Sequence, residues 1–344
     1  MPNRIKTDDW YCISARFKYN KYDSQEREAT AVKGLYIINP NSGMRFLQGN
    51  AHTMARNMLK NGKLDECRFV YTRKGGDGFA AAASLKPGEF DFVLAAGGDG
   101  TVSEVVNGLM TSGCGIPLLI LGAGTTNDFS SALGLGTGPL VLERLATDYY
   151  VREVDVGICN GRYFTNVTSG GMLSDIAHST SPELKSVYGK MAYYAEGMRE
   201  LGSLKLTSTR LRYISDKETI EEDTFLFAVV NSCQSGGFNR IAPLAKLDDG
   251  KIDVCIIKTI APTDVIPLFN NIQMGMHPND RNVRYFQTKK LRIELCNEAD
   301  SFTVDCDGEN AGSMPLEISV APEKLKLIVP KQSAKAKKLF TEWP

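Results

Sequence analysis

Apolar runs typical of buried strands alternate with amphipathic helix patterns through residues 34–128. Polar or glycine-rich loops follow the strands. The strand-like runs are 35–38, 67–72, 90–96 and 117–121, and the helix-like stretches are 46–60, 78–85 and 102–110. Strands and helices that alternate at these lengths predict a parallel, doubly wound α/β sheet, with its loops gathered at the carboxyl ends of the strands.

The pattern changes near residue 155. Beyond it, only residues 184–201 read as a strong helix, and the strand-like runs are 156–158, 163–167, 205–213, 224–231, 251–257, 290–296, 301–305 and 316–320. Many short strands with few helices predict an antiparallel β-sandwich. The 344-residue chain is long enough for both. We expect an extension (1–32), a nucleotide-binding α/β domain (33–154), an all-β acceptor domain (155–320) and a tail (321–344), for which packing back onto the α/β domain is one option.

The charges of the chain balance, because Lys and Arg number 40 and so do Asp and Glu. Without an overall positive field, nucleic acid is not an expected partner, and attraction to an acidic lipid surface must be local. None of the eight cysteines forms a Cys-x-x-Cys pair, so they read as buried apolar residues in a reducing compartment. Residues 1–10 are charged, and no apolar run approaches the roughly 18 residues of a membrane span. We expect a cytoplasmic protein with peripheral lipid contact.

The C-terminal tail combines lysines with large apolar side chains. These residues are Lys331, Lys335, Lys337, Lys338, Leu339, Phe340 and Trp343. Near an anionic membrane each lysine contributes about 1 kcal/mol, and Phe and Trp favour the headgroup boundary. The tail is predicted either to anchor the protein at a membrane surface or to pack its aromatic side chains on the α/β domain.

A glycine-rich loop directly follows the apolar strand at 92–96 and precedes a helix. Its residues are Gly97, Gly98, Asp99, Gly100 and Thr101. Glycines let backbone N–H groups approach an anion, and the following helix N-terminus favours negative charge. Asp99 then stands where a phosphate-bound Mg²⁺ needs a carboxylate. A purely structural turn is the alternative, but the strand, loop and helix context favours phosphate binding.

Two further loops are predicted at the same edge of the sheet. Residues 122–129 include Gly124, the polar residues Thr125 and Asn127, and the acidic Asp128; an Asn-Asp helix cap is the alternative here. The loop after the first strand contains Asn39, Pro40, Asn41, Ser42 and Gly43, which are also ordinary turn formers. Beside the first loop, both are predicted to contact the same ligand.

Two carboxylates flank a glycine in the second half of the chain, in the segment Asp305-Cys306-Asp307-Gly308-Glu309. Asp307 and Glu309 are candidates for a general base and its partner. An Asp-Gly hairpin turn is the alternative, and on this motif alone it is the better one.

Taken together, the chain resembles diacylglycerol kinases and related bacterial lipid kinases over residues 33–330. The resemblance rests on motifs in the family's order at 39–43, 97–101, 124–128, 154–157, 242–253 and 307–309. It implies a kinase that uses Mg²⁺ and ATP to phosphorylate a lipid hydroxyl. The nucleotide contacts it implies are Asn39, Pro40, Asn41, Ser42, Gly43, Thr72, Gly97, Gly98, Asp99, Gly100, Thr101, Glu104, Gly124, Thr125 and Asn127.

The resemblance also implies metal and catalytic roles. Asp99, Asp128 and Asp155 would hold a water-linked Mg²⁺ network, and Asp249 would belong to a structural metal site in the loop 248–251. Asp307 and Glu309 match the family's base and its essential neighbour. The resemblance leaves open which one accepts the proton; we favour Asp307, because it directly follows a strand. The family's glycine cluster is one glycine shorter here, at 235–238.

Alternatives stay open for the activity and the acceptor. An NAD kinase uses a similar glycine loop in a related fold, and a lipid-sensing module without catalysis could keep the same architecture. The acceptor could be diacylglycerol, a sphingoid base, ceramide, monoacylglycerol or a phospholipid headgroup. A monomer and a homodimer are equally compatible with the sequence.

Overall fold

The computed structural model describes residues 32–42, 45–122, 124, 127–133, 135, 149–171, 208–235, 238, 240–297, 300 and 302–330. They divide into two compact units. Unit 1 contains the chain up to Glu153 together with the segment from Leu325, and unit 2 is Val154–Lys324. The extension 1–31, the helix predicted at 184–201 and the tail 331–344 lie outside the described residues. No helix in the described part of the chain is long and apolar enough to cross a membrane.

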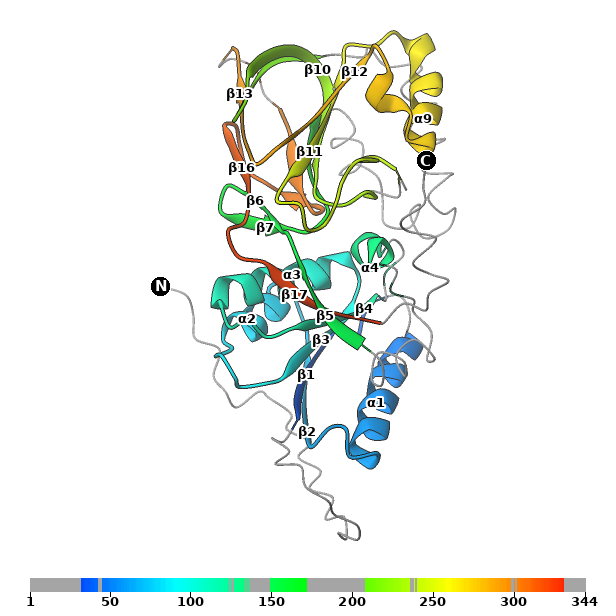
Figure 1. Ribbon diagram of the computed structural model, residues 1–344, viewed down its shortest axis with the longest axis vertical. Helices are drawn as coiled ribbons and strands as arrows, with labels where there is room; N and C mark the ends of the chain where they lie inside the picture. The colour runs from blue at the N-terminus through cyan, green and yellow to red at the C-terminus, as the bar shows by residue number, and fades with distance from the viewer. Residues whose placement is uncertain are drawn as a thin grey trace. The chain divides into compact units, whose positions relative to one another are not determined.

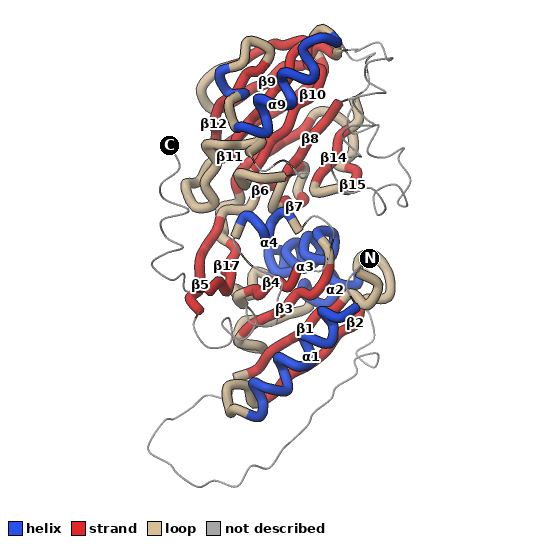
Figure 2. Tube along the Cα trace, turned by 90° about the vertical axis from the view of Figure 1, so that its right-hand side faces the viewer, coloured by secondary structure: helices blue, strands red, loops and turns tan. Residues whose placement is uncertain are grey.

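Unit 1 is built on a six-stranded sheet in the order β2-β1-β3-β4-β17-β5 (Figures 1 and 2). The pairs β1–β2, β1–β3, β3–β4 and β4–β17 are parallel. Figure 1 shows α1 on one face of the sheet and α2 and α3 on the other. The bounds are β1 Lys33–Ile38, α1 Arg45–Lys60, β2 Glu66–Tyr71, α2 Asp77–Ala83, β3 Phe92–Gly97, α3 Asp99–Ser112, β4 Leu118–Gly122, α4 Asp128–Ala132, β5 Tyr149–Val154 and β17 Leu325–Pro330.

Strands β3 and β4 are buried along their whole length, and β1 is buried after Lys33. Residues 35–38 of β1 and 93–95 of β3 are fully inaccessible. Strands covered by helices on both faces read as continuous apolar runs, which is why the sequence revealed them. The predicted parallel α/β architecture is therefore confirmed.

Helices α2 and α3 pack so closely that one position has no room for a side chain. A Cβ on Gly108 would lie 2.6 Å from both the Ala82 Cβ and the Phe79 carbonyl oxygen. We expect Gly108→Ala to lower the free energy of unfolding by about 1–3 kcal/mol, the usual cost of overpacking, as measured by chemical denaturation. Gly49→Ala in α1 is the control, because no atom lies within 4 Å of its new Cβ; an equal loss in both variants would contradict the close packing.

Unit 2 is an antiparallel sheet of eleven strands. The path runs β15-β14-β8-β10-β9-β13-β16-β6-β7, and β11 pairs with both β10 and β12. The bounds are β6 Gly157–Cys159, β7 Arg162–Phe164, β8 Val167–Gly171, β9 Thr209–Ser215, β10 Thr219–Val230, β11 Ile252–Lys258, β12 Val283–Thr288, β13 Lys290–Leu295, β14 Val304–Cys306, β15 Glu309–Asn310 and β16 Leu316–Val320.

Strands from opposite ends of this path share one core. Cys159 of β6 and Val304 of β14 belong to the same buried cluster, together with Phe227 of β10 and Ile293 of β13. The sheet therefore curves back on itself and encloses its apolar face, as a sandwich does. The predicted antiparallel all-β architecture is confirmed.

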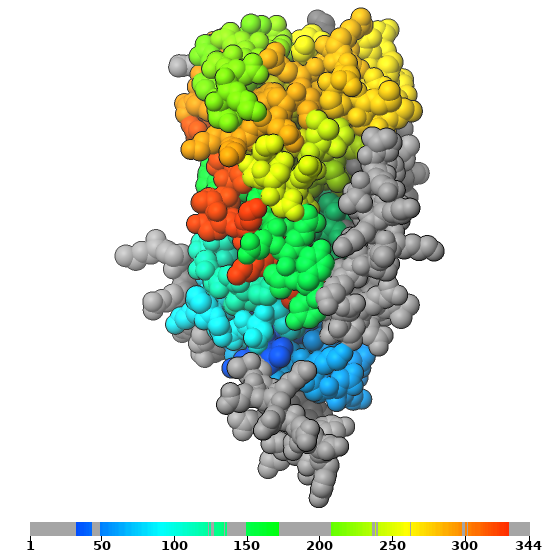
Figure 3. Space-filling view, in the orientation of Figure 1, coloured from blue at the N-terminus to red at the C-terminus, as the bar shows by residue number. Residues whose placement is uncertain are grey.

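One helix of unit 2 was not predicted from the sequence. Helix α9, Val265–Met274, packs Leu268 and Ile272 against a second apolar cluster of the sheet. Its outer side leaves Ile266 and Met274 exposed by 61% and 59%, and Figure 3 shows this part of the chain at the surface in yellow to gold. Because the exposed side of this helix also carries apolar residues, its sequence does not show the alternation of apolar and polar residues that indicates a helix.

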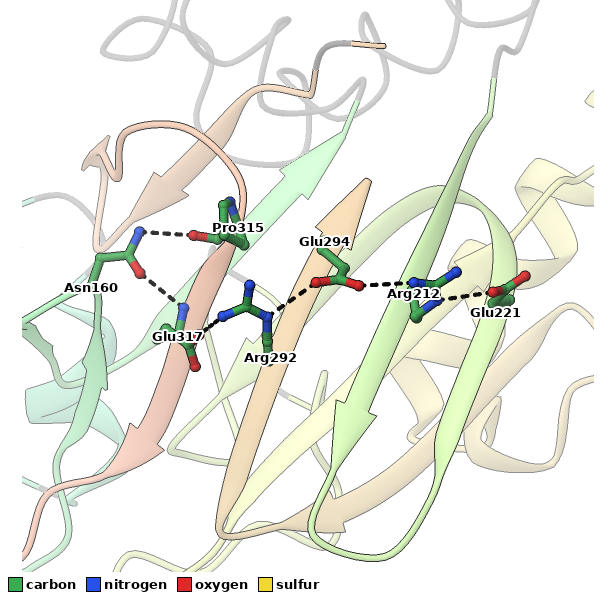
Figure 4. A network of polar contacts seen from close by, with 7 residues as sticks. All are labelled: Asn160, Arg212, Glu221, Arg292, Glu294, Pro315 and Glu317. Atoms are coloured by element: carbon green, nitrogen blue, oxygen red, sulfur yellow. Dashed lines mark hydrogen bonds and ion pairs between the residues drawn. The ribbon is translucent and has the colours of Figure 1, made fainter. Parts of the chain in front are cut away.

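The outer face of the sheet carries a row of alternating charges (Figure 4). Arg212 lies opposite Glu221 on β10 and opposite Glu294 on β13, and Arg292 lies opposite Glu317 on β16. Hydrogen bonds from Arg292 and Arg212 lower the pKa of Glu294. Because neighbouring strands place opposite charges side by side, the row favours this register over one shifted by a residue.

Asp253 of β11 is a buried carboxylate whose charge should affect stability. It accepts hydrogen bonds from the Tyr285 hydroxyl and, at 3.1 Å, from Gln287 Nε2, and burial raises its pKa from 3.8 to about 6. A raised pKa means that the folded state binds the proton more tightly, so stability falls as pH rises from about 4 to about 6. The loss is about 3 kcal/mol.

Denaturation of the parent and of Asp253→Asn over this pH range measures that contribution. The variant lacks the titrating group, so we expect its stability relative to the parent to rise from pH 4 to pH 6 and then to level off. A difference that does not change with pH would show that Asp253 titrates normally.

Candidate active site

The loop between β3 and α3 leaves a helix N-terminus open. Gly98 is the N-cap residue of α3, and no side chain caps the first turn. Gly97 is held tightly, since a Cβ there would lie 2.5 Å from the Thr101 Cβ, whereas nothing lies within 4 Å of a Cβ placed on Gly100. The free N–H groups and partial positive charge of such a helix end suit a phosphate group.

The loop after β4 touches this first loop backbone to backbone. A Cβ on Gly124 would lie 2.8 Å from the Gly98 Cα. Asn127 has a φ of 49° and fixes the loop through its side chain, which accepts a hydrogen bond from Gly124 N at 2.8 Å and donates one to Gly124 O at 2.7 Å. Thr125, a predicted nucleotide contact, lies outside the described residues.

Asp99 ties the two loops together. One carboxylate oxygen accepts a hydrogen bond from Asn127 N at 2.9 Å, and the other accepts one from Asp128 N at 3.0 Å. Asp128 itself is 9% exposed. The Asp99 carboxylate thus contacts the backbone of Asp128, and the predicted clustering of the two carboxylates around a metal stays a prediction.

The loop after β1 joins the same edge. Asn39 donates from its backbone N to Ala96 O at 2.9 Å and from its side chain to Thr101 Oγ1 at 3.0 Å. Its carbonyl accepts a hydrogen bond from Ser42 Oγ at 3.0 Å. Pro40 and Asn41 complete the described part of this turn, and Gly43 lies outside it. Three polar loops at the carboxyl ends of β1, β3 and β4 therefore converge.

Thr72 and Glu104 occupy supporting positions in unit 1. Thr72 follows β2, is buried, and donates its N–H to Ile38 O at 2.9 Å. The Glu104 carboxylate accepts hydrogen bonds from Gly76 N at 2.8 Å and Gly78 N at 2.9 Å. Glu104 therefore holds the start of α2, and its predicted contact with a nucleotide stays a prediction.

In unit 2, Asp307 is surrounded by hydrogen-bond donors. One oxygen accepts from Thr165 N at 2.7 Å and Thr165 Oγ1 at 3.2 Å, and the other accepts from Asn166 N at 3.0 Å and Val167 N at 2.9 Å. Burial raises the pKa of Asp307 to about 6, against the opposing effect of these donors. Its φ of 50° places it at a left-handed turn. The side chain holds the segment between β7 and β8.

Glu309 lies two residues further on and has a different environment. It begins β15, its side chain is 51% exposed, and it pairs with Arg162 at 2.8 Å. The hairpin expected from Asp-Gly is present, because Cys306 of β14 pairs with Glu309 across the turn. Of the two predicted catalytic carboxylates, Asp307 is half-buried and Glu309 is exposed.

The predicted metal ligands Asp155 and Asp249 lie in unit 2. Asp155 is 1% exposed and forms an ion pair with Lys324. Asp249 accepts a hydrogen bond from Lys251 N at 3.2 Å within its own turn. Among the described residues, no three His, Cys, Asp or Glu side chains gather in a group that could hold a metal ion. The grouping of Asp155 with Asp99 and Asp128 stays a prediction.

Sequence reasoning missed the residues that hold these carboxylates. Thr165 and Asn166 surround Asp307 from more than 140 positions away in the sequence, and Lys324 pairs with Asp155 across a similar separation. The buried Asn231 donates to Asp155 O at 2.8 Å and to Thr165 O at 3.4 Å, and so links the two segments. No local pattern marks such long-range partners.

Comparisons with known proteins agree over most of the chain. Residues 33–159 match the diacylglycerol kinase catalytic domain, and residues 166–329 match the YegS C-terminal NAD kinase beta sandwich-like domain. The chain is 32% identical to a diacylglycerol kinase of Bacillus subtilis, over 87% of this chain and 96% of that protein. It is 30% identical to one of Staphylococcus saprophyticus, over 81% and 89%.

A solved structure matches as well. The crystal structure of a diacylglycerol kinase from Bacillus anthracis has a TM-score of 0.69 and 27% sequence identity, with 88% of this chain and 98% of that chain covered. Sequence and fold therefore agree, and this chain belongs to the diacylglycerol kinase family.

Proposed function

We propose that this protein is a lipid kinase that transfers the γ-phosphoryl group of ATP to a hydroxyl of diacylglycerol or a related lipid, with Mg²⁺ as the metal. The observation that carries the proposal is the tie that Asp99 makes between two glycine loops beside the open N-terminus of α3. Phosphoryl transfer depends mainly on positioning and charge neutralisation. A rigid, glycine-lined surface rich in N–H groups suits that task.

The residues of unit 1 fit the phosphates of a nucleotide. Gly98 and Gly124 leave no side chain between the two loops, and the first turn of α3 offers its N–H groups. Mg²⁺ prefers one or two carboxylates together with phosphate oxygens and water, so Asp99 and Asp128 are the residues that would hold it. When bound, Mg²⁺ would neutralise charge on the phosphates.

For the acceptor, we assign the proton to Glu309 and a positioning role to Asp307. A general base needs a free lone pair within reach of the hydroxyl, and the Asp307 oxygens already accept four hydrogen bonds. Glu309 is exposed. In the transfer, the acceptor oxygen bonds to the γ-phosphorus, and the bond between the γ-phosphorus and the bridging oxygen breaks, so that ADP leaves. The hydroxyl proton passes to Glu309. This assignment reverses our preference for Asp307, which rested on its place beside a strand.

A radiolabelled-ATP assay with a panel of lipids in mixed micelles tests the proposal. The panel holds diacylglycerol, monoacylglycerol, ceramide and a sphingoid base, with NAD as a soluble acceptor and a reaction without acceptor as the blank. Labelled lipid supports the proposal and names the acceptor. Labelled NAD alone would indicate a small-molecule kinase, and lipid binding without turnover would indicate a sensing module.

A further inference from the structure

Asp155 is a buried acidic residue at the start of unit 2. It is 1% exposed, its N–H donates to Leu247 O at 2.6 Å, and its carbonyl accepts from Asn231 at 2.8 Å. These contacts fix its backbone on both sides. An ionised carboxylate at such a position is costly unless an opposite charge or strong donors compensate it.

Lys324, the last residue of unit 2, supplies that charge. Its Nζ lies 3.0 Å from Asp155 Oδ1 and donates to Asp248 O at 3.3 Å. The other carboxylate oxygen accepts a hydrogen bond from Gly250 N at 2.6 Å. The lysine side chain is 39% exposed and the aspartate side chain 2%, so the ammonium reaches a buried anion from the surface.

We propose that Lys324 is a positioning residue for Asp155, so that this carboxylate takes its counter-charge from the chain and not from Mg²⁺. The N–O distance of 3.0 Å is that of a direct ion pair. The Lys324 ammonium supplies a full positive charge to Asp155, whereas the donors to the Asp99 carboxylate are neutral backbone N–H groups, so Asp155 has no uncompensated charge to offer to Mg²⁺. The loop 247–250 is thereby held by contacts to Asp155, near the start of unit 2, and to Lys324, at its end.

The inference rests on the proposed function only for its effect on turnover. Its main test uses no ATP and no lipid: the thermal unfolding midpoint of the full chain, measured with and without Mg²⁺. The variants are Lys324→Met, Lys324→Arg, Asp155→Asn and the double variant Lys324→Met with Asp155→Asn. Lys290→Met, which removes an exposed lysine of β13, is the control for the change in charge.

We expect Lys324→Met to lower the midpoint by about 5 °C, because it leaves a buried carboxylate unpaired. Lys324→Arg keeps most of the parental midpoint, and Lys290→Met changes it little. The bare carboxylate attracts a divalent cation, so Mg²⁺ raises the midpoint of Lys324→Met more than that of the parent. This extra rise is absent from the double variant.

Two results would overturn the proposal. One is a Mg²⁺-dependent rise in the parent that Asp155→Asn abolishes, because Asp155 would then be bound to the metal. The other is a parental midpoint and Mg²⁺ response in Lys324→Met. If Lys324→Met does not fold, Asp155→Asn decides alone: its Mg²⁺ response must equal that of the parent.

Turnover gives a second readout in the holoenzyme. We expect Lys324→Met to lower kcat about tenfold without changing KM for ATP, since its side chain contacts Asp155 and Asp248 of unit 2, and Lys324→Arg to restore kcat. A parent that turns over no lipid would refute the proposed function and leave the unfolding results intact. An unchanged kcat in a folded Lys324→Met variant would refute the positioning role alone.

Discussion

Glu309→Gln is expected to lower lipid phosphorylation by about 10² to 10⁴-fold, the range that a positioned base contributes. The amide keeps the shape of the side chain and cannot take the proton. Because Glu309 is exposed and lies in unit 2, the affinity for ATP and the unfolding midpoint should stay at parental values. Steady-state kinetics, nucleotide titration and thermal unfolding of the same preparation measure all three.

Asp307→Asn is the matched comparison and should behave differently. The carboxamide has one acceptor oxygen and an NH₂ group, which would face N–H donors of residues 165–167 that now bind a carboxylate. We expect turnover to fall by a similar factor, together with a loss of stability of about 2–4 kcal/mol from unsatisfied buried donors. Parental stability in Asp307→Asn with lost turnover would instead return the base role to Asp307. If both variants kept turnover, the turn would be only a hairpin.

The second large effect is expected at Asp99. Asp99→Asn replaces one of the two oxygens that accept hydrogen bonds from Asn127 N and Asp128 N, so one of these two hydrogen bonds between the loops is lost. It also removes a carboxylate from the predicted Mg²⁺ site. We expect Mg²⁺-ATP affinity to fall at least tenfold and turnover by about 10²-fold or more, measured by calorimetry and kinetics.

Asp77 offers a control of the same chemistry. It also stands at the start of a helix, where its carboxylate accepts hydrogen bonds from Arg73 N at 2.8 Å and Lys74 N at 3.1 Å, but it lies outside the three loops. Asp77→Asn should cost stability without changing nucleotide affinity. Equal losses of affinity in both variants would mean that Asp99 acts only through the stability of unit 1.

The sequence predicted what depends on local pattern. Continuous apolar runs marked β1 and β3, and glycine with Asp or Asn marked the loops that follow β3 and β4. In contrast, α9 was missed because apolar residues occur on both its buried and its exposed side. Strand β12 was missed because Arg284 and Gln287 interrupt its apolar run. The partners of Asp155 and Asp307 depend on which distant segments the fold brings together.

The roles of side chains were harder to predict than their positions. Asp307 was selected from its Asp-Gly motif, but its hydrogen bonds to residues 165–167 depend on the pairing of β8 with β14, which a single sequence does not show. Glu104 was grouped with the nucleotide contacts because it follows the glycine loop, and in the structure its carboxylate caps another helix. A position close to a motif in the sequence therefore did not predict which groups the Glu104 side chain contacts.

Strand β17 has a consequence for the order in which this protein can be made and folded. It lies between β4 and β5 in the sheet of unit 1, yet it is residues 325–330 of the chain. During synthesis, the sheet of unit 1 therefore lacks the strand between β4 and β5 until all of unit 2 has emerged from the ribosome. Unit 2 does not depend on a strand that is translated later, since it is one continuous segment of the chain. Unit 2 is thus free to fold first, and the sheet of unit 1 is completed only when β17 has been translated after it.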